Sequence, residues 1–162
     1  MRFAKMMSIV LVLAVVSVFP NCSIAGLDGY SMAVLGTADG DAAITFGKRV
    51  TDNAEVGLTG VFFRADDNHY TPAVGPYAAY LIPVPGEIAD DWQPFTGAAM
   101  LMETEDFGFI PKAFAGVIYK PHDTLSPYLM VEKAWPSGNI STPDIMNRED
   151  DVYTWFGLRL RF

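Results

Sequence analysis

Charged residues occur inside segments that are otherwise apolar or small, and their spacing puts them on one face of each segment. Near the C-terminus, Arg159 and Arg161 alternate with Leu158 and Leu160, so an extended strand carries arginines on one face and leucines on the other. The same alternation applies to Arg49, Glu55 and Glu132. Because the set holds both signs, we expect these side chains to be buried as ion pairs.

Spacing relates two of these charges to a predicted turn. Arg49 and Glu55 lie symmetrically about Asp52, so they would face each other across a hairpin that turns there. The remaining charges, Glu132 and the two C-terminal arginines, lie on segments that are neighbours in the chain. They would also be neighbours in an antiparallel meander.

Catalytic chemistry finds little support in the sequence. A nucleophile needs a general base within hydrogen-bond reach, and the two histidines, His69 and His122, lie in segments that we place at opposite ends of the fold. His69 is close to Asp66 and Asp67, but an acid/base or metal site also needs a pocket and a convergent third group. We therefore predict no catalytic, cofactor or metal site, and no enzyme.

The first 25 residues have the three parts of a secretory signal peptide. Arg2 and Lys5 precede an apolar run over 6–19, which is followed by the small-residue site Ser23–Ala25, and we expect cleavage after Ala25. The run of 14 residues is shorter than the roughly 20 that a membrane-spanning helix needs. A retained anchor and lipid attachment at Cys22, the only cysteine, are the alternatives.

The remaining residues, 26–162, are enough for one domain. They hold nine basic and 19 acidic residues, a formal net charge of −10, which disfavours nucleic-acid binding. No apolar run after residue 25 approaches the length of a membrane helix. A helical membrane protein is therefore excluded, and a strand-rich one is not.

Period-2 alternation and turn residues predict eight strands. They cover 30–36, 42–50, 54–65, 73–82, 93–102, 112–120, 126–135 and 153–162. Outer-membrane barrels of bacteria have even strand numbers, of which eight is the smallest. We therefore predict an all-β fold, a closed antiparallel eight-stranded up-and-down transmembrane β-barrel, although the pattern leaves the facing of the fourth and fifth strands open.

The predicted connections differ in length and in charge. We expect short turns at 51–53 and 121–124 and long loops at 66–72, 103–111 and 136–149, as in barrels with short periplasmic turns and longer outer loops. The connections 38–41 and 83–92 do not fit this alternation. Acidic clusters in the long loops could bind lipopolysaccharide phosphates through divalent cations; they are Asp66/Asp67, Glu103/Glu105/Asp106 and Glu149/Asp150/Asp151.

Over residues 26–162 the chain resembles the small outer-membrane barrels of the OmpA/OmpX type. The similar pieces are Gly75–Pro76, Pro94–Ala98, Ser126–Tyr128 and the terminal Trp155–Phe162. The resemblance implies the outer membrane of a Gram-negative cell envelope and contact with its lipid and lipopolysaccharide. It also implies that the barrel-assembly machinery reads the last strand as a signal, carried here by Tyr153, Phe156, Leu158, Leu160 and Phe162.

The predicted function is that of a small non-enzymatic, monomeric outer-membrane barrel with a structural, adhesive or surface-interaction role. Its interior would be plugged by polar and charged side chains, because an eight-stranded barrel is just wide enough for side chains to fill. The alternatives are a lipid-modifying barrel enzyme, a narrow small-solute pore and a soluble periplasmic ligand-binding barrel. The soluble barrel would need apolar residues inside and polar ones outside, which is the reverse of the observed alternation.

Overall fold

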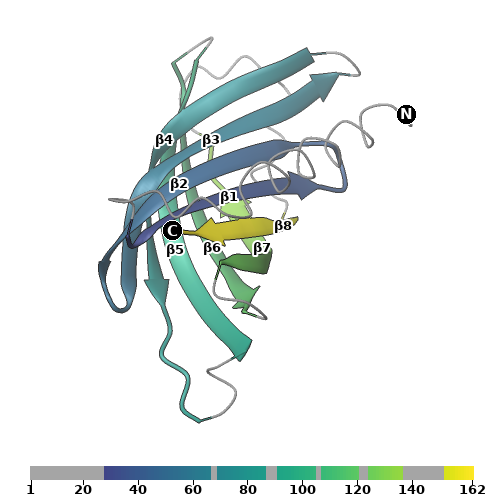
Figure 1. The fold of residues 1–162 in the computed structure, drawn as a ribbon. Helices are drawn as coiled ribbons and strands as arrows, with labels where there is room; N and C mark the ends of the chain where they lie inside the picture. Colours follow the sequence, from purple (N-terminus) through teal and green to yellow (C-terminus); the bar gives the residue numbers. More distant parts are fainter. Residues whose placement is uncertain (1–27, 67–68, 87–90, 105–106, 121–123, 137–151) are drawn as a thin grey trace.

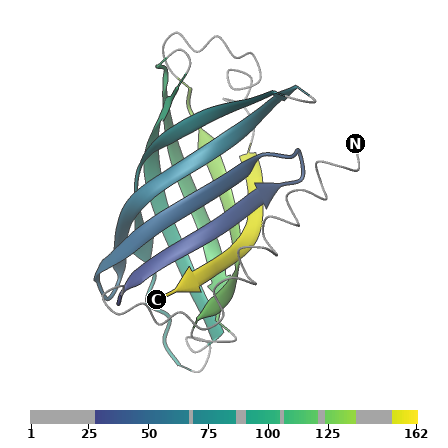
Figure 2. The same cartoon turned by 45° about the horizontal axis from the view of Figure 1, so that its top comes forward.

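The computed structural model describes residues 28–66, 69–86, 91–104, 107–120, 124–136 and 152–162. These residues form a closed barrel in which each strand pairs antiparallel with the next and β8 pairs with β1 (Figures 1 and 2). The predicted all-β, eight-stranded up-and-down barrel is confirmed. The predicted signal peptide, 1–25, lies outside the described residues, and no described helix is long and apolar enough to cross a membrane.

The strands follow the alternating segments of the sequence closely. They are β1 (Tyr30–Thr37), β2 (Ala42–Thr51), β3 (Ala54–Asp66), β4 (His69–Leu81), β5 (Trp92–Glu103), β6 (Phe109–Tyr119), β7 (Leu125–Ala134) and β8 (Val152–Arg161). We call the end where β1 begins and β8 ends the terminal end, and the opposite end the distal end. At the terminal end the backbone N–H of Phe162 donates to the carbonyl of Tyr30, which fastens the last residue to β1.

Two predicted long loops are shorter than expected, because strand pairing continues through proline. β4 begins at His69, and Pro72 inside it is the register partner of Phe62. Likewise β6 begins at Phe109 and includes Pro111. Proline removes a donor but keeps its carbonyl, and the Pro72 carbonyl accepts a hydrogen bond from the backbone N–H of Thr104, at 3.1 Å.

Alternation along each strand sorts the side chains into an inner and an outer set. The outer set is apolar and exposed, with Leu58 60% exposed and Phe156 55%. In β4, whose facing the sequence left open, Tyr77 and Leu81 are buried in the inner set. The exceptions lie where β1 meets β8: Val34 and Leu160 belong to the outer set and are each 6% exposed.

Candidate functional site

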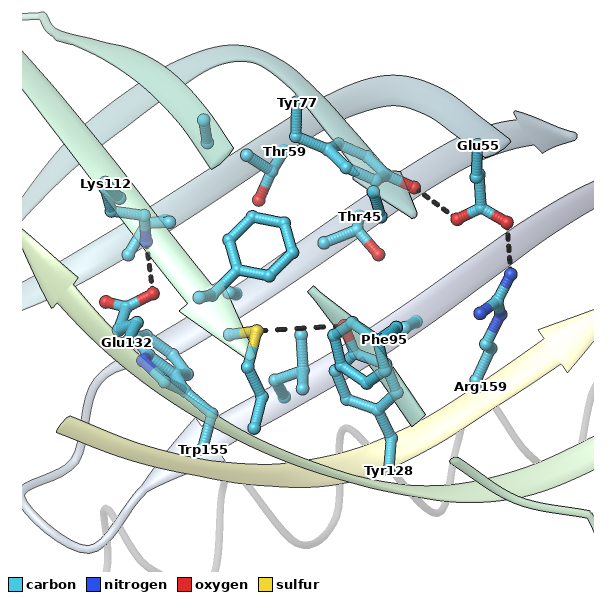
Figure 3. Close-up of a pocket in the computed structure, with 18 of the residues that line it drawn as sticks. Thr45, Glu55, Thr59, Tyr77, Phe95, Lys112, Tyr128, Glu132, Trp155 and Arg159 are labelled. Carbon is cyan, nitrogen blue, oxygen red and sulfur yellow. Dashed lines mark hydrogen bonds and ion pairs between the residues drawn. The ribbon is translucent and has the colours of Figure 1, made fainter. Parts of the chain in front are cut away.

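The barrel interior contains a small cavity between two ion pairs (Figure 3). Its volume is about 40 Å³, room for about three water molecules. One wall, from β1 to β4, is lined mainly by small side chains such as Ala33, Ala43 and Ala79. Larger side chains from β5 to β8, among them Phe95, Phe114, Tyr128 and Trp155, occupy the opposite side, so little free volume remains in the lumen.

The first ion pair joins Glu55 on β3 to Arg159 on β8. The Arg159 guanidinium and the Ser31 hydroxyl, the latter at 3.1 Å, both donate to Glu55 Oε2. The Tyr77 hydroxyl donates to Glu55 Oε1 at 2.8 Å. All four side chains are buried, so the carboxylate exchanges water for three donors on β8, β1 and β4, as a buried charge requires.

A glycine on β2 makes room for this network. A Cβ on Gly47 would lie 2.8 Å from Glu55 Oε1 and would overlap the Tyr77 hydroxyl. Gly57, which is opposite Tyr77 in the β3–β4 register, leaves similar room, because a Cβ there would lie 2.7 Å from Tyr77 Cε1. The tyrosine ring therefore lies against bare backbone and reaches the carboxylate.

The second ion pair joins Lys112 on β6 to Glu132 on β7, with 2.7 Å between Nζ and Oε2. Lys112 Nζ also lies 5.5 Å from the ring centroid of the fully buried Trp155 on β8. Both charged side chains are almost completely buried. The sequence had indicated Glu132 but not Lys112, although the alternation of β6 places Lys112 in the same phase as Phe114 and Ile118.

Three rings, which we call the aromatic layer, lie in the space between the pairs: Phe95, Phe114 and Tyr128. Phe95 stacks on Tyr128 with 4.9 Å between ring centroids, and its centroid lies 6.2 Å from that of Phe114. Along β7, Tyr128 falls between Ser126, the register partner of Arg159, and Glu132. Tyr128 therefore lies between the levels of Arg159 and Glu132, and Figure 3 shows it with Phe95 between the two ion pairs. Phe114 is opposite Glu132 in the β6–β7 register.

The aromatic layer also lies on glycines of neighbouring strands. A Cβ on Gly116 would come within 2.8 Å of Phe95 Cε1, and one on Gly97 within 2.5 Å of Phe114. The Tyr128 hydroxyl donates to the sulfur of the buried Met130 at 3.7 Å. Close packing of this kind leaves the rings little freedom to move aside.

The predicted interior charges occupy different depths. Glu55, Glu132 and Arg159 are buried, while Arg49 and Arg161 are half-buried near the terminal end. Arg49 is opposite Glu55 in the β2–β3 register, as the hairpin spacing predicts. The Glu55 carboxylate forms its ion pair with Arg159, across β2 and β1, so a carboxylate and a guanidinium of the predicted set do pair.

Several residues that we had placed in outer loops lie in strands. Glu103 ends β5 and is fully buried, so it does not belong to an exposed acidic cluster. Asp66 and His69 are register partners at the ends of β3 and β4. His122 and the acidic residues of 137–151 lie outside the described residues. Where the structure is described, no three His, Cys, Asp or Glu side chains converge as metal ligands.

At the distal end a second polar group closes the β1–β2 turn. Asp41 is buried, and its carboxylate accepts from the Thr37 hydroxyl at 3.3 Å and from the backbone N–H of Arg64 at 2.9 Å. Its own N–H donates to the Thr37 oxygen. This carboxylate therefore stabilises the turn and its contact with β3.

The predicted assembly-signal residues do not share one face of β8. Phe156 is exposed on the outer face, Leu158 is half-buried and Leu160 buried in the same phase, and Phe162 is half-buried beyond the strand end. Tyr153 belongs to the inner phase and packs against the core. The apolar outer face of β8, which the assembly machinery would bind, therefore consists of the even-numbered positions alone.

Fold and interior together define a closed eight-stranded barrel with an apolar outer surface and a charge-paired, filled lumen. No protein-family model matches the chain, and no curated protein matches it. Solved structures do: the N-terminal β-barrel domain of Pseudomonas aeruginosa OprF is 13% identical with a TM-score of 0.58, covering 82% of this chain and 95% of that one. Neisserial surface protein A is 13% identical with a TM-score of 0.55, covering 82% and 93%.

A de novo designed barrel, TMB2.3, is also similar: it is 20% identical with a TM-score of 0.51, covering 86% of this chain and 98% of the design. Identities this low show the fold alone. A fold that a designed protein shares carries no particular activity, so the function has to be argued from the lumen and the surface of this chain.

Proposed function

We propose that this chain is a small non-enzymatic outer-membrane barrel with a structural or surface-interaction role and a lumen that is closed to solutes. The observation that carries the proposal is the filled interior. Two buried ion pairs and the aromatic layer leave a cavity of about 40 Å³, which admits about three water molecules.

The outer surface supports the membrane part of the proposal. Large apolar side chains are exposed on every strand from β2 to β8, among them Leu58, Val74, Met100, Val131 and Phe156. A soluble protein seldom exposes contiguous apolar surface on this scale, whereas a membrane barrel carries an apolar band around its outside. Aromatic side chains at strand ends, such as the contacting Trp92 and Tyr119, suit the interface between lipid and water.

The partners of such a barrel would be outer-membrane lipid, lipopolysaccharide and, during biogenesis, the barrel-assembly machinery. Pairing of β8 with β1 closes the barrel within one chain, which leaves no long open edge for a second copy. We therefore propose a monomer. Surface interaction would involve the connection between Ala134 and Val152, the longest at the distal end.

Cell fractionation and reconstitution test the proposal together. The chain should remain in the outer-membrane fraction after carbonate washing, and its folded form should migrate differently from the heated form on a gel. In planar bilayers with KCl, the refolded wild type should give no channel events. Release of the chain by carbonate would contradict the membrane location, and steady conductance would contradict the closed lumen.

A narrow small-solute pore is the second candidate, because the cavity is lined by charged groups at both ends. The same bilayer measurement decides between the two. A pore would conduct in the wild-type protein, whereas a closed barrel would conduct only after its interior has been altered.

A further inference from the structure

The interior offers two kinds of obstacle to an ion, charged pairs and packed rings. The pairs are Glu55–Arg159 and Lys112–Glu132, and the rings are the aromatic layer between them. These obstacles lie at successive levels along the lumen, so an ion has to pass all of them. The slowest passage sets the conductance of the whole path.

An ion pair is a polar obstacle. At the first pair, hydroxyls of Ser31 and Tyr77 accompany the charges, and groups of this kind can replace water around a passing ion. Opening or neutralising a pair therefore removes a charge constraint in a region that already offers hydrogen bonds. It leaves the passage between the pairs unchanged in width and in chemistry.

The aromatic layer is an apolar obstacle. Its rings, with buried Leu35 and Met130 beside them, line the cavity between the pairs. Hydroxyls of Thr45 and Thr59 line the cavity on the wall opposite the rings. Uncharged hydroxyls on one wall replace few of the water molecules that a hydrated ion has to lose on passing the rings, which is costly. Constrictions lined by apolar side chains close channels to ions in the same way, because water leaves them.

We propose that the aromatic layer of Phe95, Phe114 and Tyr128, rather than either ion pair, is the barrier that keeps this barrel closed to small hydrated ions such as K⁺ and Cl⁻. The proposal rests on the proposed function, a membrane barrel with a closed lumen. The rings also pack against the barrel wall, because Phe95 and Phe114 lie on Gly116 and Gly97. Replacing one of these rings by alanine therefore widens the lumen between the two ion pairs.

Planar-bilayer conductance in KCl tests this with two sets of variants. The first set removes rings, as Phe95→Ala and, separately, Phe114→Ala. The second removes the charges and keeps polar groups of similar size, as Glu55→Gln/Arg159→Gln and Lys112→Gln/Glu132→Gln. Phe62→Ala is the matched control for ring loss, because Phe62 is an exposed phenylalanine of the outer face.

We expect channel events in the ring variants, with a current at least about tenfold above the residual leak of wild-type bilayers, the change produced when a barrier falls by about 1.4 kcal/mol. Wild type, Phe62→Ala and both charge variants should stay closed. Heat-modifiable mobility reports whether each variant is folded, and either ring variant that folds is sufficient for the test.

Two results would overturn the inference while leaving the closed barrel in place: folded ring variants that do not conduct, or charge variants that conduct as well as the ring variants do. Conductance by the wild type would instead contradict the proposed function. Because these outcomes differ in which protein conducts, failure of the inference about the aromatic layer can be distinguished from failure of the proposed function.

Discussion

At the scale of single residues, Glu55 joins four strands through its buried carboxylate. Its two oxygens accept hydrogen bonds from Arg159, Ser31 and Tyr77. Removing one partner of a buried ion pair leaves an uncompensated charge, whereas removing both charges can be nearly neutral. Loss of one charge of the pair should therefore destabilise the barrel more than loss of both charges.

Arg159→Met should lower the free energy of unfolding by about 3–5 kcal/mol, because it leaves the Glu55 carboxylate buried without its cation. Denaturant unfolding in detergent or lipid vesicles measures the loss. The double variant Glu55→Gln/Arg159→Met should recover most of it. A single variant as stable as wild type would mean that the ion pair adds nothing to the fold.

Gly47→Ala should destabilise the barrel by about 1–3 kcal/mol, because the added Cβ overlaps the Tyr77 hydroxyl and crowds the carboxylate of Glu55. Gly60→Ala is the matched control, since a Cβ on Gly60 meets nothing within 4 Å. Unfolding midpoints of the two variants in the same detergent test the difference. Equal midpoints would show that the network adapts to the methyl group.

At the scale of elements, β8 closes the barrel and also carries the terminal aromatic. Its register with β1 runs from Ser31–Arg161 to Thr37–Trp155. Beyond the strand, Phe162 donates its N–H to Tyr30 at 3.0 Å and accepts from the N–H of Gly29 at 3.1 Å. Substitution of the Phe162 side chain keeps these backbone hydrogen bonds. A variant at this position therefore tests recognition of the aromatic side chain without disturbing closure of the sheet.

Phe162→Glu should lower the amount of folded barrel in the outer membrane and leave refolding in detergent nearly intact. Burial of one aromatic side chain contributes only about 1.5–3 kcal/mol, and here the side chain is half-buried. Heat-modifiable mobility measures the folded fraction in both settings. Equal folding of wild type and variant in cells would reject the signal, while failure in detergent would mean that Phe162 acts through packing.

At the scale of the whole molecule, apolar side chains lie on both faces of the barrel wall: the interior combines an apolar core with two ion pairs, and the outer face is apolar and exposed. Exposed apolar side chains on the outer face stabilise the barrel when they contact lipid. Within water the same surface would favour aggregation. Whether lipid or water surrounds the barrel therefore determines how strongly a charged residue on the outer face destabilises it.

Leu58→Arg should lower the free energy of unfolding in lipid vesicles by about 2–4 kcal/mol, the cost of a cation near the bilayer midplane. Leu58 is 60% exposed on the outer face of β3. Thr51→Arg, at the end of β2 and near the predicted interface, should cost about 0–1 kcal/mol. Equal costs for the two variants would argue against a bilayer around β3.

Much of the fold followed from local chemistry. Period-2 alternation identified eight strands, and their predicted ends agree with the structure to within one residue except at the beginnings of β4 and β6. The error has a common cause, since proline was taken to end a strand although Pro72 and Pro111 remain paired. The same alternation put Glu55, Glu132 and Arg159 on the inner face, and applied to β6 it would also have found Lys112.

What the sequence determined by itself is therefore which side chains of one strand share a face, because that depends on the backbone repeat within the strand. What only the tertiary structure decided is the partner of each inner charge. Closure of β8 on β1 brings Arg159 to Glu55 across 104 positions of sequence. The stagger between strands, together with the room left by Gly47, fixes this partner, and neither is a property of a single strand.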